Sequence, residues 1–334
     1  MSGNALATLF HPFDTGDIRP PEKGSRALFL GAEPGFRPPS DFGASIAAVQ
    51  GFRPAYLALR SQGIDVAPEP EGTEFDLALV LAGRHRGQNE GWIAQAWNLL
   101  KPNGMIVVAG TKDDGIDSLR KRVASHAGIE GALSKYHGVV FWLRKDKSAA
   151  APFTTEAGTV VDGRFVTAPG MFSSGKIDPG SRLLAGHLPD NLKGEAADFC
   201  AGWGYLSVEL LDRCPGITAV ELFEADYASL EAAHRNLGDA RAPTGFNWTD
   251  LAAEAVGRRF DVIVMNPPFH QGRAAEPDLG RKMIDAAAKA LRPGGQMFVV
   301  ANRGLPYEAE MKRTLREPRE IVRDGTFKVL WARR

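Results

Sequence analysis

Residues 260–270 read Phe-Asp-Val-Ile-Val-Met-Asn-Pro-Pro-Phe-His, a short apolar run that ends in two prolines. The run at 262–265 is rich in β-branched residues and has the length of a strand, which is typical of a central strand in a parallel sheet. Asn266 follows at the carboxyl end of this strand. Ligands bind at that end of the strands in open α/β sheets, so the sequence indicates where the chemistry lies.

Length and composition indicate a two-domain protein without a strong charge bias. The chain has 334 residues, and its 40 Lys and Arg balance its 40 Asp and Glu, so a nucleic acid would have to bind a local basic patch. Cys200 and Cys214 fit neither a disulfide framework nor a metal site. No stretch is typical of a secretory signal or approaches the roughly 20 apolar residues of a membrane span. We expect a cytoplasmic protein without a metal or a membrane partner.

The stretch that ends at Asn266 has a counterpart earlier in the chain. Residues 75–80, Phe-Asp-Leu-Ala-Leu-Val, repeat the pattern of 260–265, and 100–109 mirrors 291–300 as a helix end, a Pro-containing turn and a buried strand. This order occurring twice predicts two related α/β domains, although any two α/β units share part of it. Polar and small residues at 144–150 have linker character, so we expect domains at 1–150 and 151–334.

The first domain lacks the proline corner. Ala82-Gly83-Arg84-His85 stands where the second domain has Asn266-Pro267-Pro268-Phe269, so we expect the first domain to be inactive and to serve packing or substrate holding. Residues 1–25 are rich in Pro, Gly and charge, which predicts a loosely ordered arm or an edge segment. We further expect strands at 27–30 and 75–81 and a helix near 44–50.

Residues 198–207, Asp-Phe-Cys-Ala-Gly-Trp-Gly-Tyr-Leu-Ser, lie between a predicted strand and an apolar helix. Gly202 and Gly204 let a ligand approach the backbone closely, and the start of the helix supplies unpaired amides. A dinucleotide site would have a third glycine where Ser207 stands, which argues against NAD. Asp198 suits a ligand with a positive group, such as the amino group of a methionine moiety. A plain strand-to-helix turn would also use two glycines.

Two more acids follow later strands. Glu224 comes after the apolar segment 217–223 and is placed to accept hydrogen bonds from both hydroxyls of a ribose; alternatively, it or Asp226 caps the next helix. Asp250 is placed to accept from the exocyclic amine of adenine, or only precedes a helix that we expect at 251–256.

The Asn266 corner is suited to a planar amine. Proline fixes φ and has no amide hydrogen, so the carbonyls of Asn266 and Pro267 can point outward. Guanine N2 and adenine N6 are poor nucleophiles because their lone pairs are delocalised into the ring. Two acceptors, the Asn266 side-chain oxygen and the Pro267 carbonyl, would hold the two hydrogens and favour the pyramidal amine that attacks. Phe269 would stack on the extruded base, a contact worth about 1–3 kcal/mol. In a plain turn, these residues would only pack.

Together these residues resemble the class I S-adenosylmethionine-dependent methyltransferases, whose Asn-Pro-Pro-aromatic motif methylates planar amines. The sequence is more closely similar to the bacterial ribosomal guanine-N2 methyltransferases, through Met171-Phe172-Ser173, the corner at 266–270, and residues 301–307 and 326–330. That family pairs a degenerate amino-terminal methyltransferase-like domain with an active carboxyl-terminal one. The resemblance implies two tandem Rossmann-like domains, the second a seven-stranded, mostly parallel sheet with helices on both faces.

The resemblance also implies a role for each site residue. It assigns the methionine part of S-adenosylmethionine to Asp198, Gly202 and Gly204, the ribose to Glu224, the adenine to Asp250, and the target base to Asn266, Pro267 and Phe269. Cys200 is expected as a further cofactor-binding residue and Pro268 as a further catalytic residue. This sequence departs from the family at Cys200, where a glycine is usual, and at Trp203, which is bulky between two glycines.

We therefore predict a monomeric enzyme that transfers a methyl group from S-adenosylmethionine to the N2 amine of a guanine in ribosomal RNA, with the small subunit favoured. Its partner would be the RNA or an assembled ribosomal subunit. Two alternatives remain open. The same corner would also methylate adenine N6 or a protein glutamine, and the chain could be a cofactor-binding scaffold without catalysis.

Overall fold

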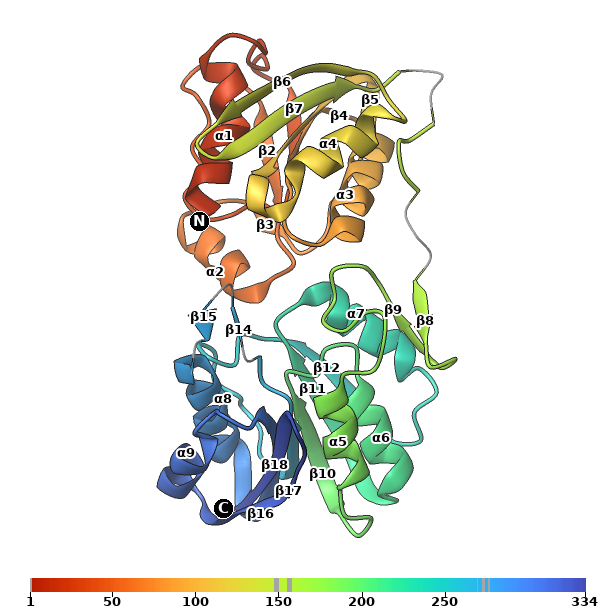
Figure 1. Cartoon of the computed structure of the whole chain (residues 1–334), viewed down its shortest axis with the longest axis vertical. Helices are drawn as coiled ribbons and strands as arrows, with labels where there is room; N and C mark the ends of the chain where they lie inside the picture. The colour runs from red at the N-terminus through yellow and green to blue at the C-terminus, as the bar shows by residue number, and fades with distance from the viewer. Residues whose placement is uncertain (1, 147–149, 155–157, 269, 272–273, 276) are drawn as a thin grey trace. The chain divides into compact units, whose positions relative to one another are not determined.

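The computed structural model describes residues 2–146, 150–154, 158–268, 270–271, 274–275 and 277–334. The chain divides into two compact units, Met1–Ala157 and Gly158–Arg334, each built around one seven-stranded sheet (Figure 1). The expected boundary after residue 150 falls in the segment between the two sheets. Within the described part of the chain, no helix is both long and apolar enough to cross a membrane.

The first sheet has the order β3-β2-β1-β4-β5-β7-β6 and is parallel except where β7 pairs with β5 and β6. Its strands are β1 (Arg26–Leu30), β2 (Ser45–Val49), β3 (Val66–Ala67), β4 (Phe75–Leu81), β5 (Leu100–Thr111), β6 (Ile129–Lys135) and β7 (Gly138–Arg144). The helices of this unit are α1 (Ser2–Asp14), α2 (Arg53–Ser61), α3 (Arg86–Leu99) and α4 (Ile116–Ala124).

The second sheet repeats this order, strand for strand, as β12-β11-β10-β13-β16-β18-β17. Its strands are β10 (Lys193–Phe199), β11 (Gly216–Glu224), β12 (Thr244–Trp248), β13 (Phe260–Met265), β16 (Leu291–Asn302), β17 (Arg316–Arg323) and β18 (Phe327–Arg333). Its helices are α5 (Pro179–Gly186), α6 (Tyr205–Arg213), α7 (Tyr227–Asn236), α8 (Pro277–Ala290) and α9 (Tyr307–Thr314). Two further pairs of short strands are antiparallel: β8 (Thr159–Val161) with β9 (Phe165–Thr167), and β14 (His270–Gln271) with β15 (Ala274–Ala275). The shared order confirms the predicted repeat and the two mostly parallel sheets.

Helices cover both faces of the second sheet, and β13 shows why. Successive side chains of a strand point to opposite faces. Val262 and Val264 are buried in the core shared with α5, α6 and α7, whereas Ile263 and Met265 are buried in the core shared with α8 and α9. Both faces of β13 are covered by helices, so every residue of its apolar run is buried in one core or the other.

The amino terminus differs from the prediction, because residues 2–14 form the helix α1 rather than a loose arm. Leu6, Leu9, Phe10 and Phe13 are all buried, at the spacing of one helix face. Pro12 lies inside this helix, near its carboxyl end. The prediction of a loose arm rested on the prolines and charged residues of 1–25 as a whole, although residues 2–14 contain an amphipathic pattern.

The helix expected near residues 44–50 is also wrong. Residues 45–49 form β2, which pairs in parallel with β1 from Ser45 to Val49. A run of five residues is too short for its periodicity to separate a strand from a helix, and the pairing with β1 decides the structure.

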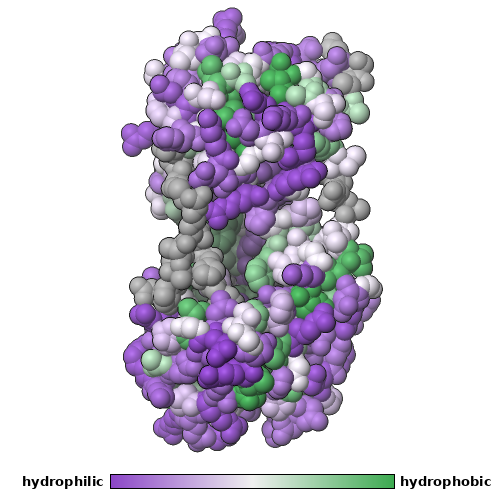
Figure 2. Space-filling view, in the orientation of Figure 1, coloured by the Kyte–Doolittle hydropathy of each residue, from purple (hydrophilic) through white to green (hydrophobic). Residues whose placement is uncertain are grey.

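Most of the surface drawn in Figure 2 is hydrophilic, with scattered hydrophobic residues. Among the described residues, the exposed large apolar side chains are Phe52, Tyr136, Val160, Phe172 and Ile321. Single exposed apolar residues are common on soluble proteins. Phe172 is of interest because it also lines the cavity described below.

Phe10→Ala tests the role of α1 in the first unit. Phe10 is 4% exposed and contacts Phe29 and Phe36, so we expect its loss to destabilise this unit by about 3–5 kcal/mol. Phe52→Ala is the matched control, since that ring is 37% exposed, and it should cost less than about 1 kcal/mol. Hydrogen exchange of peptides from β1 and β10 would measure each unit. Equal loss of protection from the two substitutions would contradict this account of α1.

Candidate functional site

Four polar residues lie at the carboxyl edge of neighbouring parallel strands in the second unit. Glu224 ends β11, Asp198 is the penultimate residue of β10, Asn266 follows β13, and Asp250 comes two residues after β12. In the sheet, these strands lie in the order β12-β11-β10-β13. Strands are spaced by about 4.8 Å, so this row spans about 14 Å, enough for an elongated ligand. Along this edge the four residues therefore stand in the spatial order Asp250, Glu224, Asp198 and Asn266.

The turn after β10 is left-handed at three positions: Cys200 (φ 59°), Gly202 (φ 54°) and Gly204 (φ 87°). A β-carbon on Gly204 would also come within 2.8 Å of Leu237, so this position requires glycine for space as well as conformation. Gly202 has open space around it. A ligand can therefore approach the backbone at Gly202, three residues before α6 begins.

Cys200 adopts a left-handed conformation that favours glycine, which explains why the family that this chain resembles usually has a glycine at this position. Its Sγ lies 3.5 Å from Met283 Sδ, in contact with the core between the sheet and α8. Burial raises the pKa of the Cys200 thiol well above its ordinary value, so the thiol remains neutral.

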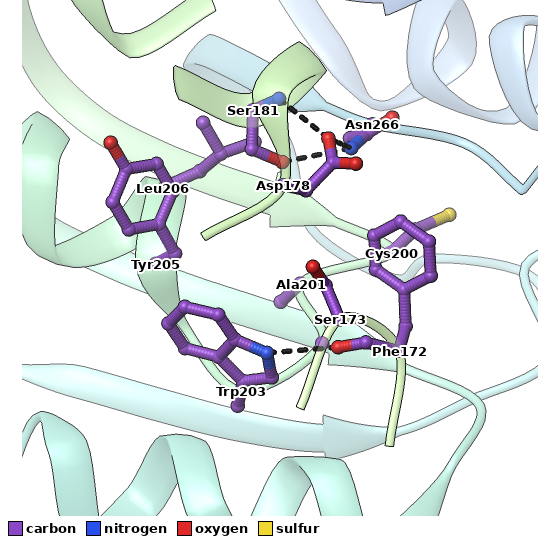
Figure 3. A pocket seen from close by; sticks show the side chains of 11 residues that line it. Phe172, Ser173, Asp178, Ser181, Cys200, Ala201, Trp203, Tyr205, Leu206 and Asn266 are labelled. Atoms are coloured by element: carbon purple, nitrogen blue, oxygen red, sulfur yellow. Dashed lines mark hydrogen bonds between the residues drawn. The ribbon is translucent and has the colours of Figure 1, made fainter. Parts of the chain in front are cut away.

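Trp203 anchors a neighbouring segment. It is buried, its ring packs against Phe165 and Tyr205, and its Nε1 donates a hydrogen bond to the carbonyl of Phe172 at 3.0 Å (Figure 3). The bulk of Trp203 is therefore accommodated in the core, and its indole fixes Phe172 beside the glycine turn.

Asp198 is fully buried and incompletely satisfied. Its Oδ2 accepts from Ser207 Oγ at 2.8 Å, whereas its Oδ1 has no hydrogen-bond partner among the described residues. Desolvation raises the pKa of Asp198 to about 7; the hydrogen bond from Ser207 opposes this shift, and the charge of Glu224 adds to it. An unpaired, buried carboxyl oxygen of this kind fits a ligand that carries an ammonium group.

Glu224 is held by backbone amides. Its Oε2 accepts from Gly202 N at 2.7 Å, and its Oε1 accepts from the amides of Ala225 and Asp226. Desolvation raises the pKa of Glu224 to about 7, although these amide bonds lower it. Asp226 rather than Glu224 caps α7, because Asp226 Oδ1 accepts from Ser229 N. The carboxylate of Glu224 is thus fixed beside the glycine turn.

Asn266 is fixed by a separate element. Its Nδ2 donates to Asp178 Oδ2 at 3.0 Å and to Ser181 Oγ at 2.8 Å, while its Oδ1 is buried without a partner among the described residues (Figure 3). Asp178 also caps α5 by accepting from Ser181 N. Nothing in the sequence signals the contact of Asp178 with Asn266, because the two residues lie 88 positions apart.

The other corner residues are partly described. Pro267 is buried and Pro268 half-buried. Phe269 lies outside the described residues, so its stacking on a base stays a prediction.

A cavity of about 40 Å³ lies between the glycine turn and Asn266, and neither Asp198 nor Glu224 lines it. Its lining comes from the loop before α5, the start of α5, the glycine turn, the start of α6 and Asn266: Phe172, Ser173, Asp178, Ser181, Cys200, Ala201, Gly202, Trp203, Tyr205, Leu206 and Asn266. This volume can enclose only a small part of a nucleoside-sized ligand. The remainder would lie along the open edge toward Glu224 and Asp250.

Asp250 makes local hydrogen bonds in the turn that follows β12. Its Oδ1 accepts from Ala252 N, and its own amide donates to Glu254 Oε2. Residues 251–253 form a turn and the chain continues without a helix to residue 256, so the helix predicted at 251–256 is wrong. The contact of Asp250 with adenine stays a prediction. Among the described residues, no cluster of His, Cys, Asp and Glu could hold a metal ion.

Comparison with known proteins agrees with this geometry. Residues 162–331 match the family model of the methyltransferase small domain. A ribosomal RNA small subunit methyltransferase C from Pseudomonas aeruginosa (strain LESB58) is 30% identical over 243 residues, which cover 70% of this chain and 72% of that protein. The protein of the same name from Escherichia coli (strain K12 / DH10B) is 29% identical over 315 residues, 91% of each chain.

A solved structure is similar over almost the whole chain. The T. thermophilus 16S rRNA N2 G1207 methyltransferase (RsmC), in complex with AdoMet and guanosine, superimposes with a TM-score of 0.79 at 27% identity. The match covers 99% of this chain and 91% of that one.

The fold and the row of residues at the sheet edge define a methyltransferase. This chain belongs to the methyltransferase small domain family, and the curated relatives named above are ribosomal RNA small subunit methyltransferases C.

Asp198→Asn removes a carboxyl group whose pKa is about 7 in the folded chain against 3.8 as the ordinary value. Folding favours the protonated acid, so the stability of the ligand-free protein falls as the pH rises from about 4 through about 7. At pH 8 we expect the variant to be more stable than wild type by about 1–3 kcal/mol, a difference that shrinks toward pH 5. We also expect S-adenosylmethionine to bind about 10- to 100-fold more weakly.

Urea unfolding at both pH values and calorimetric titration would measure these two changes. Asp239→Asn, at an exposed position, is the matched control and should alter neither quantity. A variant that is less stable than wild type at pH 8, or that binds the cofactor equally well, would contradict the role given to Asp198.

Proposed function

We propose that the second unit carries the complete site for methyl transfer and that Asn266 holds the accepting amine. The chain is an S-adenosylmethionine-dependent methyltransferase that acts on the N2 amine of guanine in 16S ribosomal RNA. One observation carries the assignment of the residues. Among the described residues, two buried side-chain oxygens have no hydrogen-bond partner: Asp198 Oδ1, in β10, and Asn266 Oδ1, directly after the adjacent strand β13. A ligand at this edge would meet both.

The cofactor half of the site would use the residues after β10, β11 and β12. S-adenosylmethionine, when bound, supplies a methyl group on a positively charged sulfur. Asp198 would accept from the ammonium group of the methionine part and Glu224 from the ribose hydroxyls, beside the backbone of Gly202 and Gly204. Asp250 would accept from the adenine amine. The raised pKa of Asp198 and the unpaired Oδ1 support this arrangement, because a bound cation would offset the desolvation of the carboxylate.

The acceptor half would use the proline corner. Asn266 Oδ1 and the carbonyl of Pro267 would accept the two hydrogens of the guanine amine and so direct its lone pair toward the methyl group. Pro268 would keep the corner rigid, and Phe269 would stack on the base. After methylation the amine carries a positive charge and loses a proton to water.

The target guanine would be the 16S rRNA nucleotide equivalent to G1207, on which the T. thermophilus methyltransferase acts. The similarity to that protein extends over 99% of this chain, which includes both units. This favours the guanine over adenine N6 or a protein glutamine, which the corner alone would not exclude.

The first unit keeps the fold but replaces the polar groups of the site. Strand register puts Phe29 where the second unit has Asp198, because Phe29 pairs with Leu79 as Asp198 pairs with Val264. Val49 pairs with Leu30, the last residue of β1, and Phe223 pairs with Phe199, the last residue of β10. Gln50, the residue after Val49, therefore corresponds to Glu224. Val80 pairs with Leu30 as Met265 pairs with Phe199, so Leu81, one residue before the Ala82 expected from the sequence, stands in the place of Asn266.

The substitution of Phe29 also fills the corresponding space. Its ring contacts Phe36 at 5.2 Å and Phe10 of α1 at 6.2 Å between ring centroids. An aromatic cluster therefore occupies the place where a cofactor acid would stand. We infer that residues 1–150 form a degenerate methyltransferase-like domain that serves packing or substrate holding, and that residues 151–334 form the catalytic domain.

Asn266→Ala should separate binding from chemistry. Because Asn266 belongs to the acceptor half, we expect the variant to bind S-adenosylmethionine with wild-type affinity and to lose at least about 100-fold in turnover, as for the loss of one catalytic hydrogen-bond partner. Calorimetry and transfer of labelled methyl to small subunits would measure the two. Undiminished turnover would refute the assignment.

The substrate is tested by mapping the product. Small subunits from a strain without this enzyme, incubated with the protein and labelled cofactor, should carry one N2-methylguanine at the position equivalent to G1207. Mass spectrometry of RNA digests identifies both the base and the position. Label at another guanine, in adenine or only in protein would overturn the proposed substrate.

A further inference from the structure

The side-chain amide of Asn266 is oriented by two residues from the start of α5. Its Nδ2 donates to Asp178 Oδ2 at 3.0 Å and to Ser181 Oγ at 2.8 Å (Figure 3). An amide nitrogen carries two hydrogens, so both donors are used. The carbonyl oxygen Oδ1 points away from these two residues and is the part of the side chain left to bind another group.

The opposite orientation of the amide is disfavoured. If Nδ2 and Oδ1 exchanged places, an amide oxygen would face the carboxylate of Asp178, which has no hydrogen to donate. Two acceptors without a shared hydrogen repel each other, and the site is partly closed to water that could bridge them. Asp178 therefore selects the orientation in which Asn266 presents an acceptor.

We propose that Asp178 and Ser181 are positioning residues for methyl transfer, which hold Asn266 so that Oδ1 accepts from the amine of the target base. This inference rests on the proposed role of Asn266. Asp178 also places a negative charge behind the amide. Hydrogen bonds in a chain polarise one another, so this charge makes Oδ1 a stronger acceptor.

A purely structural role is the competing explanation, because Asp178 Oδ2 also accepts from Ser181 N at 2.8 Å and so caps α5. Ser181→Ala separates the two roles. It removes the hydroxyl that contacts Asn266 but keeps the backbone amide that the cap requires.

The helix α7 offers a matched control. There Asp226 caps the helix and accepts from both the backbone amide and the hydroxyl of Ser229. Ser229 is buried, as Ser181 is, but its hydroxyl is bonded to the capping residue and not to Asn266. Ser229→Ala thus removes a buried hydroxyl from the third position of an Asp-capped helix without touching the Asn266 cluster.

The first measurement is the single-turnover rate of methyl transfer to small subunits at saturating cofactor. We expect Ser181→Ala to lower this rate about 10-fold and Asp178→Ala about 100-fold, as for residues that orient a catalytic group. Asp178→Asn keeps an acceptor oxygen and should restore part of the rate. The cofactor Kd of Ser181→Ala and the rate of Ser229→Ala should each stay within about 2-fold of wild type. A wild-type rate for Ser181→Ala, or a loss explained by weaker cofactor binding, would overturn the inference.

The second measurement is a double-mutant cycle. In the Asn266→Ala background, Ser181→Ala should leave the residual rate unchanged, because its effect acts through Asn266. The same fold-loss in both backgrounds would overturn the positioning role. A wild-type rate for Asn266→Ala alone would refute the role of Asn266, and transfer to a different acceptor would refute the proposed substrate, so the three failures are distinguishable.

Discussion

The parallel pairing of β12, β11, β10 and β13 is the constraint on which the functional half of the molecule depends. Because these neighbouring strands run in one direction, their carboxyl ends form one edge, and Asp250, Glu224, Asp198 and Asn266 stand along it in order. The same burial that fixes these groups raises the pKa of Asp198 and Glu224 to about 7. Ionisation of the two carboxyls is therefore unfavourable, and a cation bound beside them would offset this cost.

The two sheets differ at their functional edges and agree at the opposite edge. Asp261 accepts from the amide of Glu195, the third residue of β10, and pairs with Arg292 at 2.6 Å. Its counterpart Asp76 accepts from the amide of Arg26, the first residue of β1, and pairs with Lys101 at 2.6 Å. The first unit therefore retains the structural ion pair but has Phe29 and Gln50 at the positions of Asp198 and Glu224.

The sequence predicted the groups whose roles follow from position on a strand, and missed those whose roles depend on distant contacts. Asn266 and Glu224 could be placed because a buried strand immediately precedes each of them. Asp178 and Ser181 could not, because their bonds to Asn266 join residues 88 and 85 positions apart. The strand β2 and the helix α1 were missed for a related reason. Their sequences are short or mixed in composition, and packing against the sheet decides their structure.

The binding stoichiometry of S-adenosylmethionine tests most directly whether the chemistry belongs to the second unit alone. Glu224→Gln gives the second unit the residue that the first has at Gln50, and an amide loses the charged hydrogen bonds of the acid. Calorimetric titration should give one cofactor per wild-type chain, with the variant weakened by about 10- to 100-fold. Two cofactors per chain, or one bound with unchanged affinity by the variant, would contradict the assignment.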